Sequence, residues 1–129
     1  PFQPAIARGL DDGDADIAAL RASLDGRREL LMEGLESAGF SYVRPSGTYF
    51  VCADASPFLS PEAPDGAALA RALPGRIGVA GVPLSAFCAA GSPTARLLSN
   101  WMRFTFVKDE GTLRTAIERL QLLLALARS

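Results

Sequence analysis

The 129-residue chain is long enough for one domain with a buried core, and its 49% hydrophobic and 21% charged residues are typical of soluble globular proteins. A net charge of −1 disfavours nucleic acid and membrane surfaces as partners, since both attract proteins with a basic surplus. Histidine is absent, so triads that need an imidazole base are excluded.

Two cysteines occur, Cys52 and Cys88, and neither belongs to a CxxC pair. Their isolation disfavours a metal site, and we expect both to be small, apolar, reduced residues of a cytoplasmic protein. We expect no targeting segment ahead of the first predicted helix, and the leucine-rich C-terminal segment is too short and too charged to span a bilayer.

The N-terminal third of the chain has helical periodicity. Phe2, Ile6 and Leu10 are spaced as on a helix, and an acidic stretch at 11–14 interrupts the pattern. A longer amphipathic helix follows from Asp16, and its apolar face consists of Ile17, Leu20, Leu24, Leu31, Leu35 and Ala38. We expect this whole face to pack on the core and Gly39 to end the helix in a left-handed conformation.

Two strands are predicted next, at residues 40–43 and 48–53, with a turn between them. The second is almost continuously apolar, which predicts a central strand buried on both faces. Residues 54–65 contain three prolines and are predicted to form a loop.

Asp65 can cap a short helix that extends to Leu73 and is predicted to stop at Pro74-Gly75. A third strand is predicted at residues 77–83, and it opens into residues 84–88. Residues 89–94 are predicted to be a Gly/Ser/Pro loop.

Residues 101–110 are predicted to be a strand that leads directly into the last helix. Side chains alternate between the faces of a strand, so the core face would carry Met102, Phe104 and Phe106. Trp101, Arg103 and Thr105 would share the opposite face. The alternation leaves Arg103 as either a solvated surface residue or an anion receptor with a planar fork suited to carboxylates.

Asp109 is predicted to cap the final helix. The apolar face of that helix would consist of Leu113, Ala116, Ile117, Leu120, Leu123, Leu124 and Ala127. The predicted fold is therefore one α+β domain, with a small, mostly antiparallel sheet and helices packed on one face.

Three segments occur in a characteristic order: residues 47–50 (GTYF), residues 78–88 (GVAGVPLSAFC) and residues 102–110 (MRFTFVKDE). Together with residues 28–40 and 1–5, they resemble the C-terminal small domain of class I/II aminotransferases, the fold-type I pyridoxal-phosphate enzymes. The segment at 82–88 is most similar to the kynurenine/glutamine/methionine branch and to the neighbouring N-succinyldiaminopimelate aminotransferases.

This resemblance implies that residues 1–129 are the C-terminal small domain of an enzyme that transfers an amino group between an amino acid and a 2-oxo acid. Arg103 matches the arginine that binds the substrate α-carboxylate, and Tyr49, Ser85 and Phe87 match positions that border the substrate pocket. The residues that bind pyridoxal 5′-phosphate belong to a large domain upstream and are absent from this chain. We therefore expect a cytoplasmic homodimer as the full-length enzyme and no activity from the chain alone.

Two other functions are compatible with the residues themselves. The chain could be a free-standing α+β module that binds a small carboxylate for regulation, or a structural or dimerisation domain. The length of the source gene separates these functions, because an aminotransferase gene would encode a lysine-bearing large domain immediately upstream of Pro1.

Overall fold

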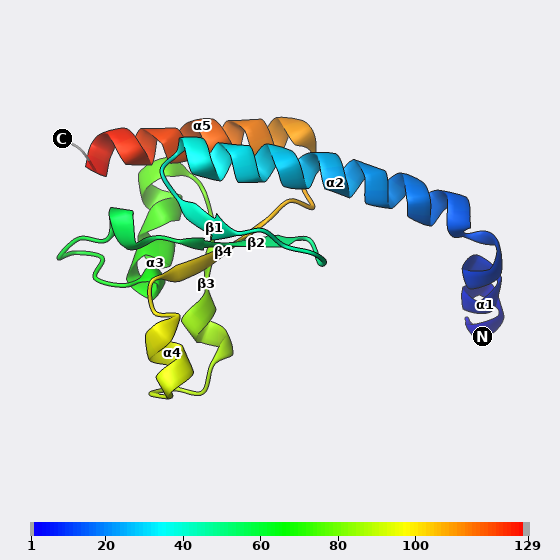
Figure 1. Cartoon of the computed structure of the whole chain (residues 1–129), viewed down its shortest axis with the longest axis horizontal. Coiled ribbons are helices and arrows are strands. Elements are labelled where there is room, and N and C mark those ends of the chain that lie inside the picture. The colour runs from blue at the N-terminus through cyan, green and yellow to red at the C-terminus, as the bar shows by residue number, and fades with distance from the viewer. Residues whose placement is uncertain (1, 128–129) are drawn as a thin grey trace.

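The computed structural model describes residues 2–127, which fold into helices around one small sheet (Figure 1). In chain order the elements are α1 (Gln3–Asp12), α2 (Asp14–Ser37), β1 (Ser41–Val43), β2 (Phe50–Asp54), the 3-10 helix η1 (Ser56–Phe58), α3 (Gly66–Ile77), β3 (Val82–Pro83), the 3-10 helix η2 (Leu84–Phe87), α4 (Pro93–Leu97), β4 (Trp101–Thr105) and α5 (Glu110–Ala127). Across residues 2–127, no helix has the length and apolar character needed to cross a membrane.

The four strands form one sheet in the order β1-β2-β4-β3, and every neighbouring pair is antiparallel. β4 is therefore a central strand, with Arg103 opposite Cys52 of β2 on one side and opposite Val82 of β3 on the other. The structure confirms the predicted α+β class and the antiparallel sheet.

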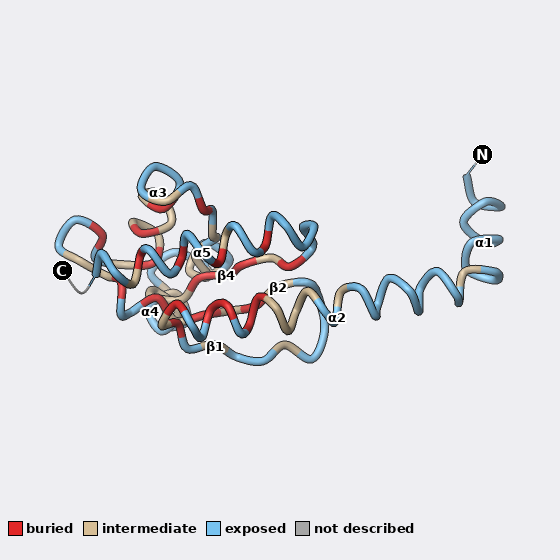
Figure 2. Tube along the Cα trace, turned by 90° about the horizontal axis from the view of Figure 1, so that it is seen from above, coloured by how far each residue is buried: buried red, intermediate tan, exposed pale blue. Residues whose placement is uncertain are grey.

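One face of the sheet packs against helices and forms the core. The strands contribute Val51, Ala53, Met102 and Phe104 to this face, all of which are buried. The helices α2, α3 and α5 contribute Leu31, Leu35, Leu69, Leu73, Leu113, Leu120 and Leu123. Figure 1 shows α2 and α5 side by side over the sheet, and the buried positions in Figure 2 lie in this layer.

The N-terminal arm, residues 2–23, extends beyond this layered body (Figures 1 and 2). It comprises α1 and the first part of α2. The prediction that Ile17 and Leu20 pack on the core is wrong, because their exposed fractions are 48% and 56%. The sheet and α5 cover only the C-terminal part of α2, so the apolar face of the arm has no neighbour among the described residues.

The predicted helix ends at Gly39, Asp65 and Asp109 are confirmed. Gly39 has φ 88°, and its N–H donates to the Glu36 carbonyl at 2.9 Å in a left-handed termination of α2. Asp65 Oδ1 accepts from the Ala68 N–H at 2.7 Å, and Asp109 Oδ1 accepts from the Thr112 N–H at 2.9 Å. These carboxylates therefore satisfy backbone donors that a helix start leaves free.

The predicted stop of α3 at Pro74-Gly75 is wrong. The helix continues through Pro74, whose carbonyl accepts from the Gly78 N–H at 3.0 Å, and Gly78 ends it at φ 68°. A proline removes one N–H donor without preventing the next turn. Residues 77 and 78 are thereby taken from the predicted third strand, which shrinks to Val82–Pro83.

Two further predictions need correction. The loop predicted at 89–94 ends two residues early, because α4 begins at Pro93; Ser92 Oγ accepts from the Ala95 N–H at 3.1 Å and caps the helix. The burial of β2 on both faces is also wrong. Val51 and Ala53 are fully buried, whereas Phe50 and Cys52 are half-buried on the opposite face, which α2 and α5 leave open. This open face carries the candidate site.

Candidate functional site

Arg103 lies at the middle of β4, on the open face of the sheet. Met102 and Phe104 on either side of it point into the core, with exposed fractions of 0% and 4%, whereas Arg103 is half-buried. The alternation predicted for this strand is therefore confirmed. The opposite face of the sheet is packed in the core, and this packing holds the backbone at Arg103 rigidly in place.

Two aromatic rings contact the Arg103 guanidinium. Its Cζ lies 3.9 Å from the ring centroid of Phe50 and 4.4 Å from that of Phe87. Phe50 comes from β2, where it is opposite Thr105 and thus diagonal to Arg103 on the same face. Phe87 comes from η2, the turn of helix that follows β3. A cation over an aromatic face is stabilised by roughly 0.5–2 kcal/mol, depending on its hydration.

No carboxylate among residues 2–127 forms an ion pair with Arg103. Its Nε is buried and has no hydrogen-bond partner. A buried donor without an acceptor costs about 1–3 kcal/mol, more when the group is charged. The aromatic rings carry no net charge, so the positive charge of Arg103 is available to an incoming anion.

Arg103 lines a cavity of about 570 Å³ on the open face. Its other walls are mostly apolar and include Phe50, Phe87, Trp101, Leu84 and Leu98. Both free cysteines, Cys52 and Cys88, also contribute to the lining. One cation within apolar walls suits a small molecule that has a carboxylate at one end and a carbon skeleton beyond it.

The structure brings together only two of the four residues named from the resemblance, Arg103 and Phe87. Tyr49 is 47% exposed outside the cavity, with its ring centroid 4.4 Å from that of Phe50. Ser85 is half-exposed in η2, where its carbonyl accepts from the Cys88 N–H at 3.2 Å, and it does not line the cavity.

Phe50 and Trp101 line the site but were not among the residues named from the resemblance. The alternation along β4 already placed Trp101 on the face of Arg103. The same period-two pattern along β2 places Phe50 and Cys52 on one face, opposite Val51 and Ala53. The alternation along β2 thus already placed Phe50 on the face away from the core. It was overlooked because β2 was predicted to be buried on both faces.

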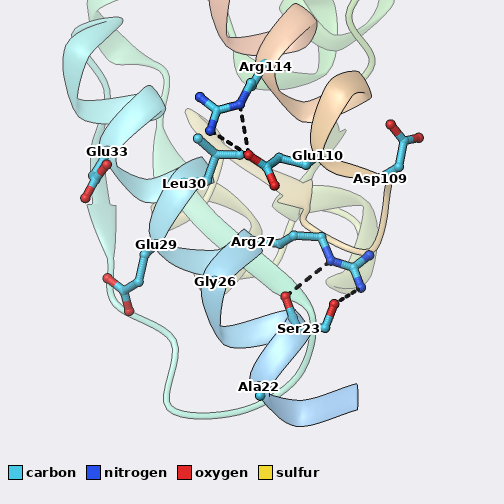
Figure 3. Close-up of a pocket in the computed structure, with 10 residues that line it drawn as sticks. All are labelled: Ala22, Ser23, Gly26, Arg27, Glu29, Leu30, Glu33, Asp109, Glu110 and Arg114. Atoms are coloured by element: carbon cyan, nitrogen blue, oxygen red, sulfur yellow. Dashed lines mark hydrogen bonds and ion pairs between the residues drawn. The ribbon is translucent and has the colours of Figure 1, made fainter. Parts of the chain in front are cut away.

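A second cavity, of about 670 Å³, lies between α2 and the start of α5 (Figure 3). Arg27 Nη1 donates to the carbonyls of Val107 and Lys108 at 2.8 and 3.0 Å, and Arg27 Nη2 donates to Ser23 Oγ at 2.8 Å. Arg114 pairs with Glu110. Both guanidinium groups are therefore engaged within the chain, and this cavity is a junction between helices rather than an anion receptor.

The described residues do not form a pyridoxal-phosphate site of their own. Covalent attachment of that cofactor needs a lysine amine, and Lys108 is the only lysine in the sequence. Lys108 is exposed beyond the end of β4 and does not line the Arg103 cavity. Among the described residues, those that line the Arg103 cavity therefore offer a guanidinium for an anion but no lysine for the cofactor.

The family model for aminotransferase class I and II matches residues 1–120. Among curated proteins, the chain is 47% identical over 127 residues to the probable N-succinyldiaminopimelate aminotransferase of Mycobacterium tuberculosis. That alignment covers 95% of this chain but only 31% of the relative, so the chain spans less than a third of the longer protein.

Solved structures agree with this match. The N-succinyldiaminopimelate aminotransferase of Mycobacterium tuberculosis superimposes with a TM-score of 0.83 at 45% identity, over 95% of this chain and 30% of that one. The aspartate aminotransferase of Thermus thermophilus, solved with maleate, gives a TM-score of 0.70 at 32% identity, over 89% of this chain and 26% of that one. The chain belongs to the class I and II aminotransferase family.

Proposed function

We propose that residues 1–129 are the C-terminal small domain of a pyridoxal-phosphate-dependent aminotransferase and that Arg103 binds the α-carboxylate of its substrates. The observation that carries the proposal is the state of Arg103. It lies in a cavity, between aromatic rings, with no carboxylate of the described chain to neutralise it.

The reaction of this family explains why one receptor is sufficient. An amino acid gives up its amino group to become a 2-oxo acid, and a second 2-oxo acid takes that group to become an amino acid. All four molecules carry a carboxylate bonded directly to the reacting carbon. A guanidinium that binds this carboxylate through two N–H groups fixes the position of the reacting carbon as well. Arg103 would thus serve both halves of the reaction.

The cofactor would come from the rest of the protein. Pyridoxal phosphate, when bound, supplies the electron sink that makes the C–H bond beside the amine labile. A large domain upstream would hold it, since this chain has no suitable lysine. The chain's coverage of only 31% of its Mycobacterium tuberculosis relative supports such a domain. So do the exposed apolar residues of the N-terminal arm, which suit a partner surface.

The remaining parts of the proposal concern the whole protein. We propose that it acts as a cytoplasmic homodimer, with a small amino acid and a 2-oxo acid as its ligands. Four donor candidates follow. N-Succinyldiaminopimelate, kynurenine and methionine occur in the names of similar proteins, and glutamine comes from the resemblance described above. N-Succinyldiaminopimelate and the acceptor 2-oxoglutarate carry further carboxylates, which would need a cation from the rest of the protein, because the cavity described here contains only one.

The test uses the protein encoded by the complete gene. Each of the four donors is incubated with 2-oxoglutarate, and the newly formed amino acid is quantified together with the visible absorbance of the bound cofactor. We expect transfer from at least one donor and a cofactor band that changes on donor addition. A gene that starts near Pro1, or the absence of transfer from every donor, would contradict the proposal and favour a free-standing carboxylate-binding module.

A further inference from the structure

The orientation of the Arg103 guanidinium is not set by hydrogen bonds within the chain. Hydrogen bonds do orient other arginines of the chain. Arg27, Arg44 and Arg119 each donate to a carbonyl or carboxylate of another part of the chain. Within residues 2–127, the Arg103 side chain donates to no acceptor, and its Nε is buried without a partner. Its flexible side chain must therefore be ordered by packing.

The packing comes from Phe50 and Phe87, whose rings both lie against the guanidinium. Their ring centroids are 3.9 and 4.4 Å from Arg103 Cζ. The ring contact recorded for Phe50 is with Tyr49, and Phe87 has no ring contact among the described residues. Phe50 forms the inner, half-buried cover, and Phe87 forms the outer cover and remains 60% exposed.

These ring contacts use none of the hydrogen-bond donors of Arg103. All N–H bonds of an arginine lie in the plane of the group, so a ring packed against a face of the guanidinium removes no donor. The in-plane N–H groups are thereby left for two-point contact with an incoming carboxylate.

We infer that Phe50 and Phe87 are positioning residues that hold the Arg103 guanidinium in place for the substrate carboxylate. The inference rests on the proposed function and goes further than it. The resemblance places Phe87 at the border of the substrate pocket. Its role there is indirect, because it positions Arg103. Phe50 receives a role that the resemblance did not assign.

A double-mutant cycle in the full-length enzyme separates action through Arg103 from direct contact with the substrate. The variants are Phe50→Leu, Phe87→Leu and Arg103→Ala, together with the two combinations that contain Arg103→Ala. Leucine retains an apolar side chain and removes the aromatic face. The measured quantity is kcat/KM for the best donor of the screen, with cofactor absorbance recorded for each variant.

Each leucine variant is expected to lower kcat/KM by about 5- to 30-fold, mainly through KM, with the cofactor absorbance retained. In the Arg103→Ala background, the same substitutions should change kcat/KM by less than about twofold, because the group they position is gone. The conservative variants Phe50→Tyr and Phe87→Tyr keep the aromatic face and should stay within about threefold of the wild type.

Equal losses with and without Arg103 would overturn the inference, because the rings would then act on the substrate or on the fold. Wild-type kinetics in both leucine variants would also overturn it while leaving the proposed function intact. If the wild-type protein transfers no amino group from any donor, the proposed function fails, and the inference fails with it.

Discussion

Gly34 of α2 lies directly against Ile117 of α5. A Cβ added to Gly34 would stand 2.3 Å from Ile117 Cγ1 and 2.5 Å from Ile117 Cδ1, which is too close for non-bonded carbon atoms. The absence of a side chain at Gly34 therefore allows the two helices to approach as closely as they do over the sheet.

We expect Gly34→Ala to lower the free energy of unfolding by roughly 1–3 kcal/mol, the usual cost of overpacking a core. Gly26 on the same helix is the matched control, because an added Cβ there meets nothing within 4 Å. Gly26→Ala should raise stability by about 0.5–1 kcal/mol through helix propensity alone. Urea unfolding measures both changes. In an Ile117→Ala background the cost of Gly34→Ala should largely disappear, and a full cost there would contradict the packing argument.

Arg103→Ala in the full-length protein is expected to lower kcat/KM for the amino donor by about 10- to 150-fold, the equivalent of one charge-assisted contact. The visible absorbance of bound pyridoxal phosphate should persist, because this chain does not hold the cofactor. Arg103→Lys should recover only part of the loss, since an ammonium cannot make the planar two-point contact. Steady-state kinetics that match the wild type would remove Arg103 from the site.

The cap of α5 is expected to depend on pH. Hydrogen bonds from the Thr112 side chain and then from its backbone lower the pKa of Asp109 below the ordinary value of 3.8. A carboxyl group with a lowered pKa in the folded state stabilises the fold above its ordinary pKa. That contribution disappears as the pH falls through the folded-state pKa.

The thermal midpoint of Asp109→Ala should therefore fall below that of the wild type at pH 7, and the difference should shrink between about pH 5 and pH 2. Asp109→Asn is the matched control, because a neutral amide can cap the helix without titrating. Because neither asparagine nor alanine titrates, the difference between Asp109→Asn and Asp109→Ala should stay nearly constant over the same range. A pH-independent difference for Asp109→Ala would show that the charge of Asp109 does not contribute.

The isolated 129-residue chain is expected to associate with itself through the apolar face of its N-terminal arm. Ile17 and Leu20 are largely exposed on this arm, and contiguous apolar surface attracts partners. Light scattering over a wide concentration range should show a mass that rises with concentration. Ile17→Glu with Leu20→Glu should reduce that rise. Leu122→Glu, at a residue of α5 that is 59% exposed, should leave it unchanged.

The sequence was most informative where one face of an element is buried by the chain itself. Residues 101–106 alternate strictly, so the directions of Met102, Arg103 and Phe104 followed from the period of a strand. The contact between Arg103 and Phe87 could not be predicted in this way. It depends on how η2 folds back over the sheet after β3, which is a tertiary arrangement that no local pattern specifies.

The wrong predictions share a physical cause. The pattern of apolar residues in a sequence is the same whether the surface that covers them belongs to the same domain or to another one. Phe50 and Cys52 on β2, and Ile17 and Leu20 on the arm, were all expected to be buried for this reason. The error at Pro74 has another cause, because a proline was expected to stop the helix. Packing of the buried Leu73 stabilises α3 enough for it to continue past one missing N–H.

The division of α2 into a packed part and a projecting part has a mechanical consequence. Its 24 residues form one unbroken helix of about 36 Å, and a helix of this length is stiff compared with a loop. If the packed body rotates about the C-terminal end of α2, the N-terminal end of the helix moves with it. Each degree of rotation displaces that end by about 0.6 Å. α1 and α2 meet at Gly13, which belongs to neither helix. A change in the tilt of the sheet that carries Arg103 would therefore displace whatever the arm contacts.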